Sequence, residues 1–348
     1  MTAQERGGAA AGAAPARRNG GRPRRKKVAI ALGDPAGIGP EIALKAALDP
    51  AVLRIARPVL YGDPHALAVH ARACGLPADF LVVERGGQAG DDDRVVLVGR
   101  RQLTEQSLQL GAVRAEHGRA ALDSARAAIE AALAGEVDAV IAAPQTETAI
   151  HAAGIHFDGH PGFVARCTGV PEEDAFLMLC FDDKRIAHAT LHVSLQRALE
   201  LITPARVQRV IRTTHEALAR IGIAAPRLAV SGLNPHAGEE GLFGSEEQTI
   251  IGPAIRALRR DGLAVDGPFG ADTMFHRTSY DAFVVMLHDQ GHIAAKLLAR
   301  TGTAAMTIGT PVVFSSVAHG SALDIAGQGK ADHTAMVEAV RRVTGLTG

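Results

Sequence analysis

Short apolar runs alternate with longer amphipathic segments along most of the chain. The runs are five to eight residues long, rich in Val, Ile, Leu and Ala, and predict strands at 28–32, 58–62, 94–99, 137–144, 175–181, 185–192, 227–234, 282–288 and 304–309. Several are apolar on both faces, as in strands that helices cover on both sides. Helical spacing, with a Gly near each end, predicts helices over 112–135, 204–222 and 245–262. This alternation predicts an α/β fold with a mainly parallel sheet.

The first 27 residues differ from the rest of the chain. They hold eight Lys or Arg residues against one acid and show no apolar periodicity, which predicts a disordered basic extension at 1–27. Without them, the 37 basic and 37 acidic residues of the chain become 29 and 36. The body therefore has no basic surplus, and a nucleic-acid partner is not expected. Binding of nucleic acid through the extension alone is a separate alternative.

Membrane insertion and disulfide bonding both have weak support in the sequence. No apolar run approaches the roughly 18 residues that a membrane span requires, so no membrane partner is expected. The three cysteines, Cys74, Cys167 and Cys180, are odd in number and form no C-x-x-C motif. This usage is typical of free thiols in a reducing compartment and predicts a cytoplasmic protein.

The glycine-rich segment GDPAGIGPE, at 33–41, follows the first predicted strand and precedes a helical pattern. Its glycines Gly33, Gly37 and Gly39 lack the spacing of the G-x-G-x-x-G dinucleotide motif, and no G-x-x-x-x-G-K-[ST] motif is present. The segment therefore predicts a strand-to-helix turn and gives no support for a phosphate-binding loop.

Three histidines stand at or just after the ends of predicted strands: His192, His236 and His288. The carboxyl ends of parallel strands lie at one edge of a sheet, where ligands gather. Each histidine alone could be structural, but three at equivalent places predict a metal site. Three imidazoles with an open position suit catalytic Zn²⁺ first, and Fe²⁺, Co²⁺ or Mg²⁺ as alternatives. Asp272 and Asp289 could add a ligand or orient an imidazole.

Other segments could act on a substrate or a nucleotide. His160 lies in the glycine-rich loop FDGHPG, as a substrate contact or as an ordinary loop residue. Lys296 follows His288 by eight residues and would be a base if it is partly desolvated, or a helix-surface residue otherwise. The glycines of 318–332, AHGSALDIAGQGKAD, permit close approach of a nucleotide, and the same pattern fits a turn before a helix.

From about residue 28 to the C-terminus, the chain resembles the PdxA-type (4-hydroxythreonine-4-phosphate dehydrogenase) family. The resemblance rests on the ordered motifs GDPAGIGPEI, GIHFDGHPGF, TLHVSL, GLNPHAGEEGLFG, GPFGADTMF, MLHDQGH and SSVAHGSALDIAGQGKAD. It implies two α/β/α domains around a cleft, similar to isocitrate and isopropylmalate dehydrogenases. Residues 28–148 and 318–348 would form the cofactor-side domain, and 149–317 the metal, substrate and dimerisation domain. It also implies a homodimer whose active site takes metal ligands from both subunits.

The resemblance assigns roles to individual residues. The family's metal ligands fall on His192, His236 and His288, and its substrate contacts on His160 and Lys296. Lys296, with Asp272 and Asp289, would form the catalytic group. The β-decarboxylating dehydrogenases bind NAD(P) through a loop similar to 318–332. Their likeness gives as cofactor-binding candidates His319, Gly320, Ser321, Asp324, Ile325, Gly327 and Asp332. Asp324 and Asp332 would repel a 2′-phosphate, which favours NAD.

Departures from the family pattern concern the substrate. The Thr that follows the substrate histidine is Pro161 here, the substrate-site Asn is Ala305, and the substrate-site Arg is Phe314. Loss of that Arg removes a charge-assisted contact, worth on the order of 1.5–3 kcal/mol, from a phosphate site. The stretches TETAIH (146–151) and HDQGHIAAKLLA (288–299) resemble instead the terephthalate cis-dihydrodiol dehydrogenase branch.

This likeness predicts a metal-dependent, NAD-linked, decarboxylating dehydrogenase of a cis-dihydrodiol carboxylate, with protocatechuate as the product. One alternative is a dehydrogenase of 4-phosphohydroxy-L-threonine, in pyridoxal phosphate biosynthesis, or of a related phosphorylated sugar acid. Another is a sensor or carrier that binds a carboxylate and a nucleotide without turnover. Retention of Lys296, Asp272 and all three histidines favours an enzyme.

Overall fold

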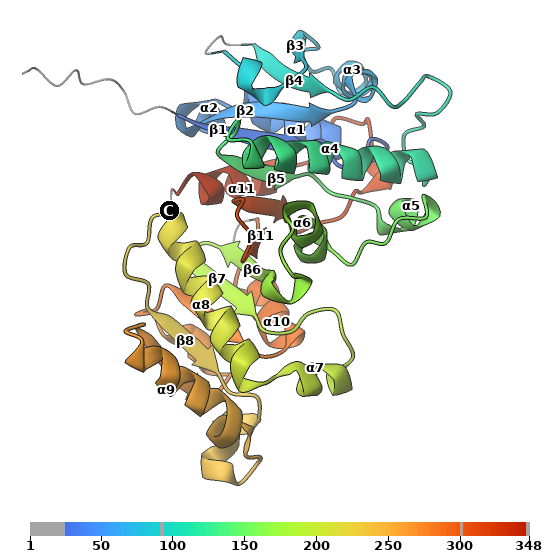
Figure 1. The fold of residues 1–348 in the computed structure, drawn as a ribbon. Helices are drawn as coiled ribbons and strands as arrows, with labels where there is room; N and C mark the ends of the chain where they lie inside the picture. Colours follow the sequence, from blue (N-terminus) through green and yellow to red (C-terminus); the bar gives the residue numbers. More distant parts are fainter. Residues whose placement is uncertain (1–24, 91–93, 300–301, 346–348) are drawn as a thin grey trace, which may run out of the picture.

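The structure is a computed structural model that describes residues 25–90, 94–299 and 302–345. Its strands form one twelve-stranded sheet in the order β3-β4-β2-β1-β5-β12-β11-β6-β7-β10-β8-β9 (Figure 1). The pairings of β12 with β11, of β11 with β6 and of β6 with β7 are antiparallel. All other pairings between described strands are parallel. The expected α/β class with a mainly parallel sheet is therefore confirmed.

The elements have the following bounds. The strands are β1 (Lys26–Ala31), β2 (Ala56–Gly62), β3 (Phe80–Val83), β4 (Val95–Gly99), β5 (Ala139–Ala142), β6 (Phe176–Phe181), β7 (Lys184–His188), β8 (Leu228–Ser231), β9 (Val265–Phe269), β10 (Ala282–Val285), β11 (Ala304–Ile308) and β12 (Phe314–Val317). The α-helices are α1 (Gly39–Leu48), α2 (Pro50–Ile55), α3 (Pro64–Ala73), α4 (Ala115–Leu133), α5 (Glu147–Ala152), α6 (His160–Thr168), α7 (Leu195–Leu201), α8 (Pro204–Arg220), α9 (Gly252–Arg260), α10 (His288–Leu298) and α11 (Thr334–Thr344). The short 3₁₀ or π turns are η1 (Gly86–Gln88), η2 (Glu172–Asp174), η3 (Pro235–Gly241), η4 (Glu247–Ile251), η5 (Met274–His276) and η6 (Leu323–Ile325).

Helices cover both faces of the sheet, and alternate strand residues build a core on each face. In β1, Val28 and Ile30 join the cluster that includes residues of α1, α8, α9 and α11. Their neighbours Ala29 and Ala31 face the opposite cluster, with residues of α4 and α6. The first cluster also takes in Val284 of β10, so one apolar layer extends under both ends of the sheet. None of the described helices is both long and apolar enough to cross a membrane.

The two expected domains share this continuous sheet. The first end of the sheet carries β3, β4, β2, β1 and β5, and the other end carries β6, β7, β10, β8 and β9. Between them lie β12 and β11, from the C-terminal part of the chain. The dark red α11 packs beside the blue elements at the first end (Figure 1), where it contacts α1, α2 and β5. Helices α5 and α6 pack on α4, although α5 spans the expected boundary at 148 and α6 follows it.

The observed elements differ from the expected ones in two ways. Strand β1 begins at Lys26, two residues inside the expected extension, and the remainder of that prediction, residues 1–24, lies outside the described residues. The strands expected over 185–192 and 282–288 end earlier, at His188 and Val285. This shortening puts His192 and His288 in the segments beyond the sheet.

Candidate active site

Two of the three predicted metal ligands meet at the end of the sheet. Strands β7 and β10 are parallel, with His188 opposite Val285. Backbone hydrogen bonds continue past the strand ends, from the amide of Thr190 to the carbonyl of Met286. His192 follows in a bend, and His288 is the first residue of α10. Their ring centroids lie 5.5 Å apart.

The spacing of these two rings fits a shared metal ion. An imidazole nitrogen lies about 2.0–2.1 Å from tetrahedral Zn²⁺, which places two ring centroids roughly 5 Å apart. The Nδ1 of His288 is 2.7 Å from Oδ1 of Asp289. This carboxylate–histidine contact fixes the ring and leaves Nε2 free for a ligand bond. This is the contact that the predicted orienting role of Asp289 would use.

His236, the third predicted ligand, lies apart from this pair. It is in η3 with a φ of 51°, its side chain is 65% exposed, and its Nδ1 contacts Oε2 of Glu239 at 3.2 Å. Among the described residues of one copy, no group of three or more His, Cys, Asp or Glu side chains could hold a metal ion. One copy of the chain thus supplies two adjacent imidazoles, and a complete three-histidine site needs a ligand from elsewhere.

Two further histidines extend the pair into the protein. His292 stacks on His288 with ring centroids 3.8 Å apart and nearly parallel planes, and His188 lies 4.8 Å beyond His292. Neither residue was among the predicted ligands. Each lies four residues from a predicted ligand, and on α10 this spacing places His288 and His292 on one face. That four-residue spacing was the one feature of the sequence that could have pointed to His188 and His292.

Burial keeps both additional histidines neutral. His188 is fully buried, and burial lowers its pKa to about 3. Its Nδ1 lies 3.3 Å from the carbonyl of Leu177, while its Nε2 has no hydrogen-bond partner among the described residues. Burial also lowers the pKa of His292 to about 4. Gly291 makes room for this arrangement, since a Cβ there would lie 2.2 Å from Nε2 of His188.

His192 lines two neighbouring cavities. One, of about 420 Å³, is lined by His192, His288 and Asp289 among others. The other, of about 360 Å³, is lined by His192, His160 and His319 among others. The second cavity therefore brings together a predicted metal ligand, the predicted substrate contact and a residue of the predicted cofactor loop.

Two aromatic rings lie next to the ring of His160. His160 is the first residue of α6. Phe157 meets its ring edge-on at 5.7 Å between centroids, and Phe314 lies 5.4 Å from it. Burial lowers the pKa of His160 to about 4, and its buried Nε2 has no protein partner among the described residues. A neutral imidazole with an unused nitrogen can accept or donate one hydrogen bond to a ligand.

The opening motif holds the predicted cofactor loop in place. The amide of Ile38 donates to the carbonyl of Ser321 at 2.9 Å. A Cβ on Gly37 would lie 2.6 Å from that carbonyl oxygen, so the close approach requires glycine. Further along, Oε1 of buried Glu41 accepts from the amide of Ala331 at 3.0 Å. The segment GDPAGIGPE is therefore a platform for the loop.

Lys45 completes this contact with the loop. Its Nζ donates to Oε1 of Glu41 at 2.7 Å and to the carbonyls of Gly329 and Ala331 at 3.0 and 2.7 Å. Burial opposes ionisation of Glu41, but the hydrogen bonds from Lys45, Cys74 and Ala331 outweigh it and lower the pKa of the carboxyl. An ionised Glu41 thus anchors the end of the loop.

The remaining cofactor candidates lie along the same loop. His319 and Gly320 precede Ser321, whose Oγ accepts from Oγ1 of Thr146 at 2.9 Å. Asp324 and Ile325 belong to η6, with Asp324 exposed, and Gly327 has a φ of 72°. The carboxylate of Asp332 is engaged by Thr334, which donates to Oδ1 from its amide and hydroxyl groups. The hydrogen bonds from Thr334 lower the pKa of Asp332.

Lys296 and Asp272 are exposed and line neither histidine cavity. Asp272 lies in the turn between β9 and η5. Lys296 follows His288 and His292 at four-residue intervals on α10, so the three side chains share one helix face. One copy of the chain therefore brings neither residue into contact with the predicted substrate histidine.

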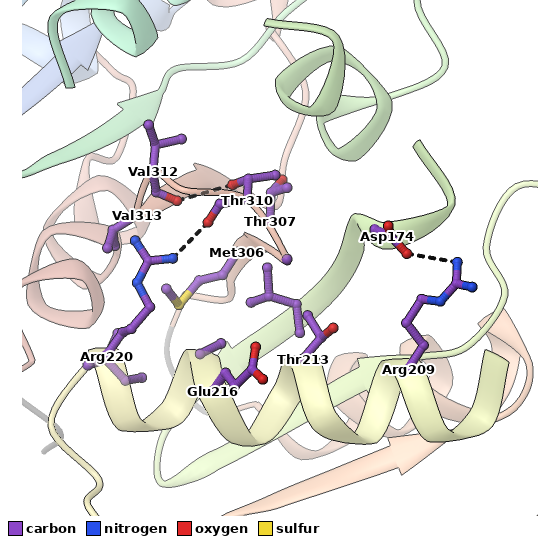
Figure 2. A pocket seen from close by; sticks show the side chains of 14 residues that line it. Asp174, Arg209, Thr213, Glu216, Arg220, Met306, Thr307, Thr310, Val312 and Val313 are labelled. Atoms are coloured by element: carbon purple, nitrogen blue, oxygen red, sulfur yellow. Dashed lines mark hydrogen bonds and ion pairs between the residues drawn. The ribbon is translucent and has the colours of Figure 1, made fainter. Parts of the chain in front are cut away.

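A third cavity, of about 460 Å³, lies between α8 and β11 (Figure 2). None of the predicted site residues lines it. Figure 2 shows Arg209 paired with Asp174, at 2.7 Å, and Arg220 directed at the β11–β12 turn. Arg220 donates from Nη1 and Nη2 to the carbonyls of Thr310 and Pro311, each at 2.7 Å. These bonds link α8 to the centre of the sheet.

Comparison with known proteins identifies the family. Residues 54–343 match the model of the pyridoxal phosphate biosynthetic protein PdxA. The chain is 44% identical to a 1,2-dihydroxy-3,5-cyclohexadiene-1,4-dicarboxylate dehydrogenase of a Comamonas species, over 90% of this chain and 96% of that protein. It is 39% identical to a D-threonate 4-phosphate dehydrogenase of Cupriavidus necator, over 90% and 95%.

Solved structures agree with this result. A 4-hydroxythreonine-4-phosphate dehydrogenase from Burkholderia phymatum superposes with a TM-score of 0.82 at 36% identity, covering 93% of this chain and 99% of its own. A terephthalate 1,2-cis-dihydrodiol dehydrogenase from Burkholderia xenovorans gives a TM-score of 0.69 at 44% identity, covering 92% and 98%. The chain therefore belongs to the PdxA family, and these relatives are dehydrogenases.

Proposed function

We propose that this protein is a metal-dependent, NAD-linked dehydrogenase that oxidises and decarboxylates a cis-dihydrodiol dicarboxylate derived from terephthalate. The observation that carries the proposal is the set of apolar side chains next to His160. Phe314, fully buried, stands where the phosphate-using relatives are expected to carry Arg, and Ala305 and Pro161 stand in place of Asn and Thr. Phe157, which lines the cavity, suits a cyclohexadiene ring, and at these three positions a phosphate finds no charged partner. The name of the Comamonas relative supports the same substrate class.

The second candidate is oxidation of a phosphorylated substrate such as 4-phosphohydroxy-L-threonine or D-threonate 4-phosphate. The relatives named for such substrates favour it. The residues at 161, 305 and 314 do not, because a phosphate monoester needs cationic or multiple hydrogen-bond partners and these three side chains offer none. Arg206 is the one Lys or Arg among the described residues that line the cavity.

His192, His288 and His236 would hold the divalent metal, with Zn²⁺ as the first choice. When bound, the metal would act as a Lewis acid on the oxygen of the reacting hydroxyl and on the carbonyl that replaces it. Asp289 keeps the His288 ring in the ligating orientation. The loop 318–332, held by Glu41 and Lys45, would place NAD as the hydride acceptor at the His319 side of the cavity.

The chemistry follows from the substrate. Loss of hydride from C2 and of the hydroxyl proton, which we assign to Lys296, gives a ketone β to the C1 carboxylate. The C1–carboxylate bond then breaks, its electron pair enters the ring, and CO₂ leaves. With the new C1=C2 double bond the ring is aromatic, and the C2 oxygen, now a phenolate, takes back the proton held by Lys296 to give the catechol acid protocatechuate, together with NADH. His160 would hydrogen-bond the substrate and hold the ring against Phe157.

We propose that the protein acts as a homodimer, because the site in one copy lacks a third ligand and an enclosed base. Large apolar side chains are exposed on α7, on α10 and after η3, namely Leu195, Leu199, Leu242, Phe243, Ile293, Leu297 and Leu298. Lys296 lies beside Ile293 and Leu297 on α10, so a second copy packed there would cover it. His236 lies next to exposed Phe243, with ring centroids 5.9 Å apart. His236 of the second copy would thus supply the missing ligand.

The substitution Leu297→Glu tests this assembly. Leu297 is 80% exposed in one copy, and a carboxylate in an apolar interface is costly to bury. Sedimentation velocity is expected to show a dimer for the wild type and a monomer for Leu297→Glu, with metal retention reduced in the monomer. Leu133→Glu, at the end of α4 and 47% exposed, is the matched control and is expected to stay dimeric. A Leu297→Glu dimer that holds its metal would contradict the interface.

Turnover assays test the reaction. With NAD and the 1,4-dicarboxylate diol, we expect NADH and CO₂ in equimolar amounts, both suppressed by prior removal of the metal with a chelator. 4-Phosphohydroxy-L-threonine and D-threonate 4-phosphate are the comparison substrates. Faster turnover of either, or NADH without CO₂ from the diol, would refute the proposed reaction. The thiols of Cys74, Cys167 and Cys180 are all free, in line with our proposal that this chemistry takes place in the cytoplasm.

A further inference from the structure

Arg206 lies in the wall of the cavity that contains His160 and His192. It is in the first turn of α8, where its amide donates to Oγ1 of the capping residue Thr203 at 3.2 Å. Its side chain is held by backbone carbonyls. Nε donates to Ala189 at 2.7 Å and Nη1 to Glu173 at 3.3 Å. These bonds use two of the five N–H groups of the guanidinium and fix its plane.

Arg206 forms no ion pair with a carboxylate among the described residues, although the charges of Glu173 and Asp174 are close enough to act on it. Arg209, one turn further along α8, pairs with Asp174 at 2.7 Å, as Figure 2 shows. Arg206 instead lies over the ring of Phe176, with Cζ 5.0 Å from the centroid. It is the only Lys or Arg among the described residues that line this cavity. A half-buried, fixed and unpaired guanidinium is an incomplete ion pair, which a carboxylate ligand would complete.

We propose that Arg206 binds the substrate carboxylate that the product retains, an inference that rests on the proposed function. The substrate carries two carboxylates, and only one leaves as CO₂. An ion pair to the departing carboxylate would stabilise the ground state and raise the barrier to decarboxylation. An ion pair to the persisting carboxylate stabilises ground and transition states equally, so it provides specificity without this penalty. Arg206 therefore selects 1,4-dicarboxylate diols over diols with a single carboxylate.

The test compares two diols, one with both carboxylates and one with only the carboxylate at C1. The measured quantity is the ratio of kcat/KM for the first diol to that for the second. Arg206→Met is expected to lower this ratio about ten- to a hundredfold, mainly through KM of the dicarboxylate, as expected for loss of a charge-assisted hydrogen bond. Arg206→Lys keeps the charge without the planar fork and should give an intermediate ratio. If Arg206→Met folds poorly, the Lys variant still tests the assignment. Arg209→Met should leave the ratio unchanged.

A second measurement separates this inference from the proposed reaction. Calorimetry with terephthalate and benzoate, which cannot react, should show that the wild type prefers the dicarboxylate and that Arg206→Met loses the preference. This result would support the site even if no diol were turned over, in which case the proposed function alone would fail. An unchanged ratio in Arg206→Met, an equal loss with both diols, or equal wild-type affinity for terephthalate and benzoate would overturn the assignment.

Discussion

Replacing His192 by alanine is expected to remove the bound metal and to lower kcat/KM by about a thousandfold or more, because a Lewis acid at the reacting oxygen supplies several kcal/mol and each 1.36 kcal/mol is tenfold in rate. His192 is the one predicted metal ligand that lines both histidine cavities. Its loss would leave His288 as the single ligand that one copy contributes beside the substrate. The measurements are metal content by mass spectrometry and initial rates of NADH formation.

The matched control is His215→Ala on α8. That histidine lines none of the three cavities and should keep both metal and activity. Metal content separates loss of the ligand from loss of a substrate contact, since a purely substrate-contacting His192 would leave the metal in place. A His192→Ala protein with full metal content would show that the ion binds elsewhere.

Gly291→Ala is expected to weaken metal binding by tenfold or more and to lower the free energy of unfolding by about 1–3 kcal/mol, the range for overpacking a filled core. A Cβ at this position would lie 2.2 Å from Nε2 of His188 and 2.9 Å from two of its ring carbons. His188 cannot turn away, since it is fully buried and its Nδ1 contacts the carbonyl of Leu177. The strain would therefore displace the first turn of α10, which carries His288 and Asp289.

A double-mutant cycle checks this explanation. His188→Ala removes the ring that a methyl group at Gly291 would strike, so the double variant should bind metal better than Gly291→Ala alone. Gly87→Ala is the control, because the nearest atom to its added Cβ would lie at 3.9 Å. Metal affinity by competition with a chelator and thermal unfolding are the measurements. If the two single effects simply add, the steric explanation is wrong.

The local pattern of apolar and polar residues was sufficient to predict much of the fold and part of the candidate site. Apolar runs bounded by polar residues located β1, β7 and β10, and the rule that ligands gather at strand ends brought His192 and His288 together. Strands β3, β9 and β12 were missed. VDGPF of β9 contains Gly and Pro and FSSV of β12 is half polar, whereas FLVV of β3 is an apolar run of only four residues. The antiparallel centre was also missed, although the turn at Asp182, with a φ of 43°, is typical of a hairpin.

Other parts of the site depend on contacts that no local pattern encodes. The roles of Glu41 and Lys45 appear only when residues 329–331 fold back onto α1. The environment of His188 depends on the absence of a side chain at Gly291, in another element. In the proposed dimer, the position of His236 relative to the pair depends on a second copy, which no local pattern in the sequence of one chain describes. Arg206 stood unnoticed in an ordinary amphipathic helix.

The position of β12 in the sheet also determines when the sheet can be completed during synthesis. β12 pairs with β5 on one side and β11 on the other, yet it is the last strand to leave the ribosome. Until then, β5 and β11 each present an open edge in the middle of the future sheet, where edge-to-edge association with other chains can begin. The loop that we propose as the nucleotide site emerges later still. A chain terminated before residue 314 is therefore expected to be both inactive and prone to aggregate, and, if the proposed NAD site is right, NAD would bind only to protein whose translation is complete.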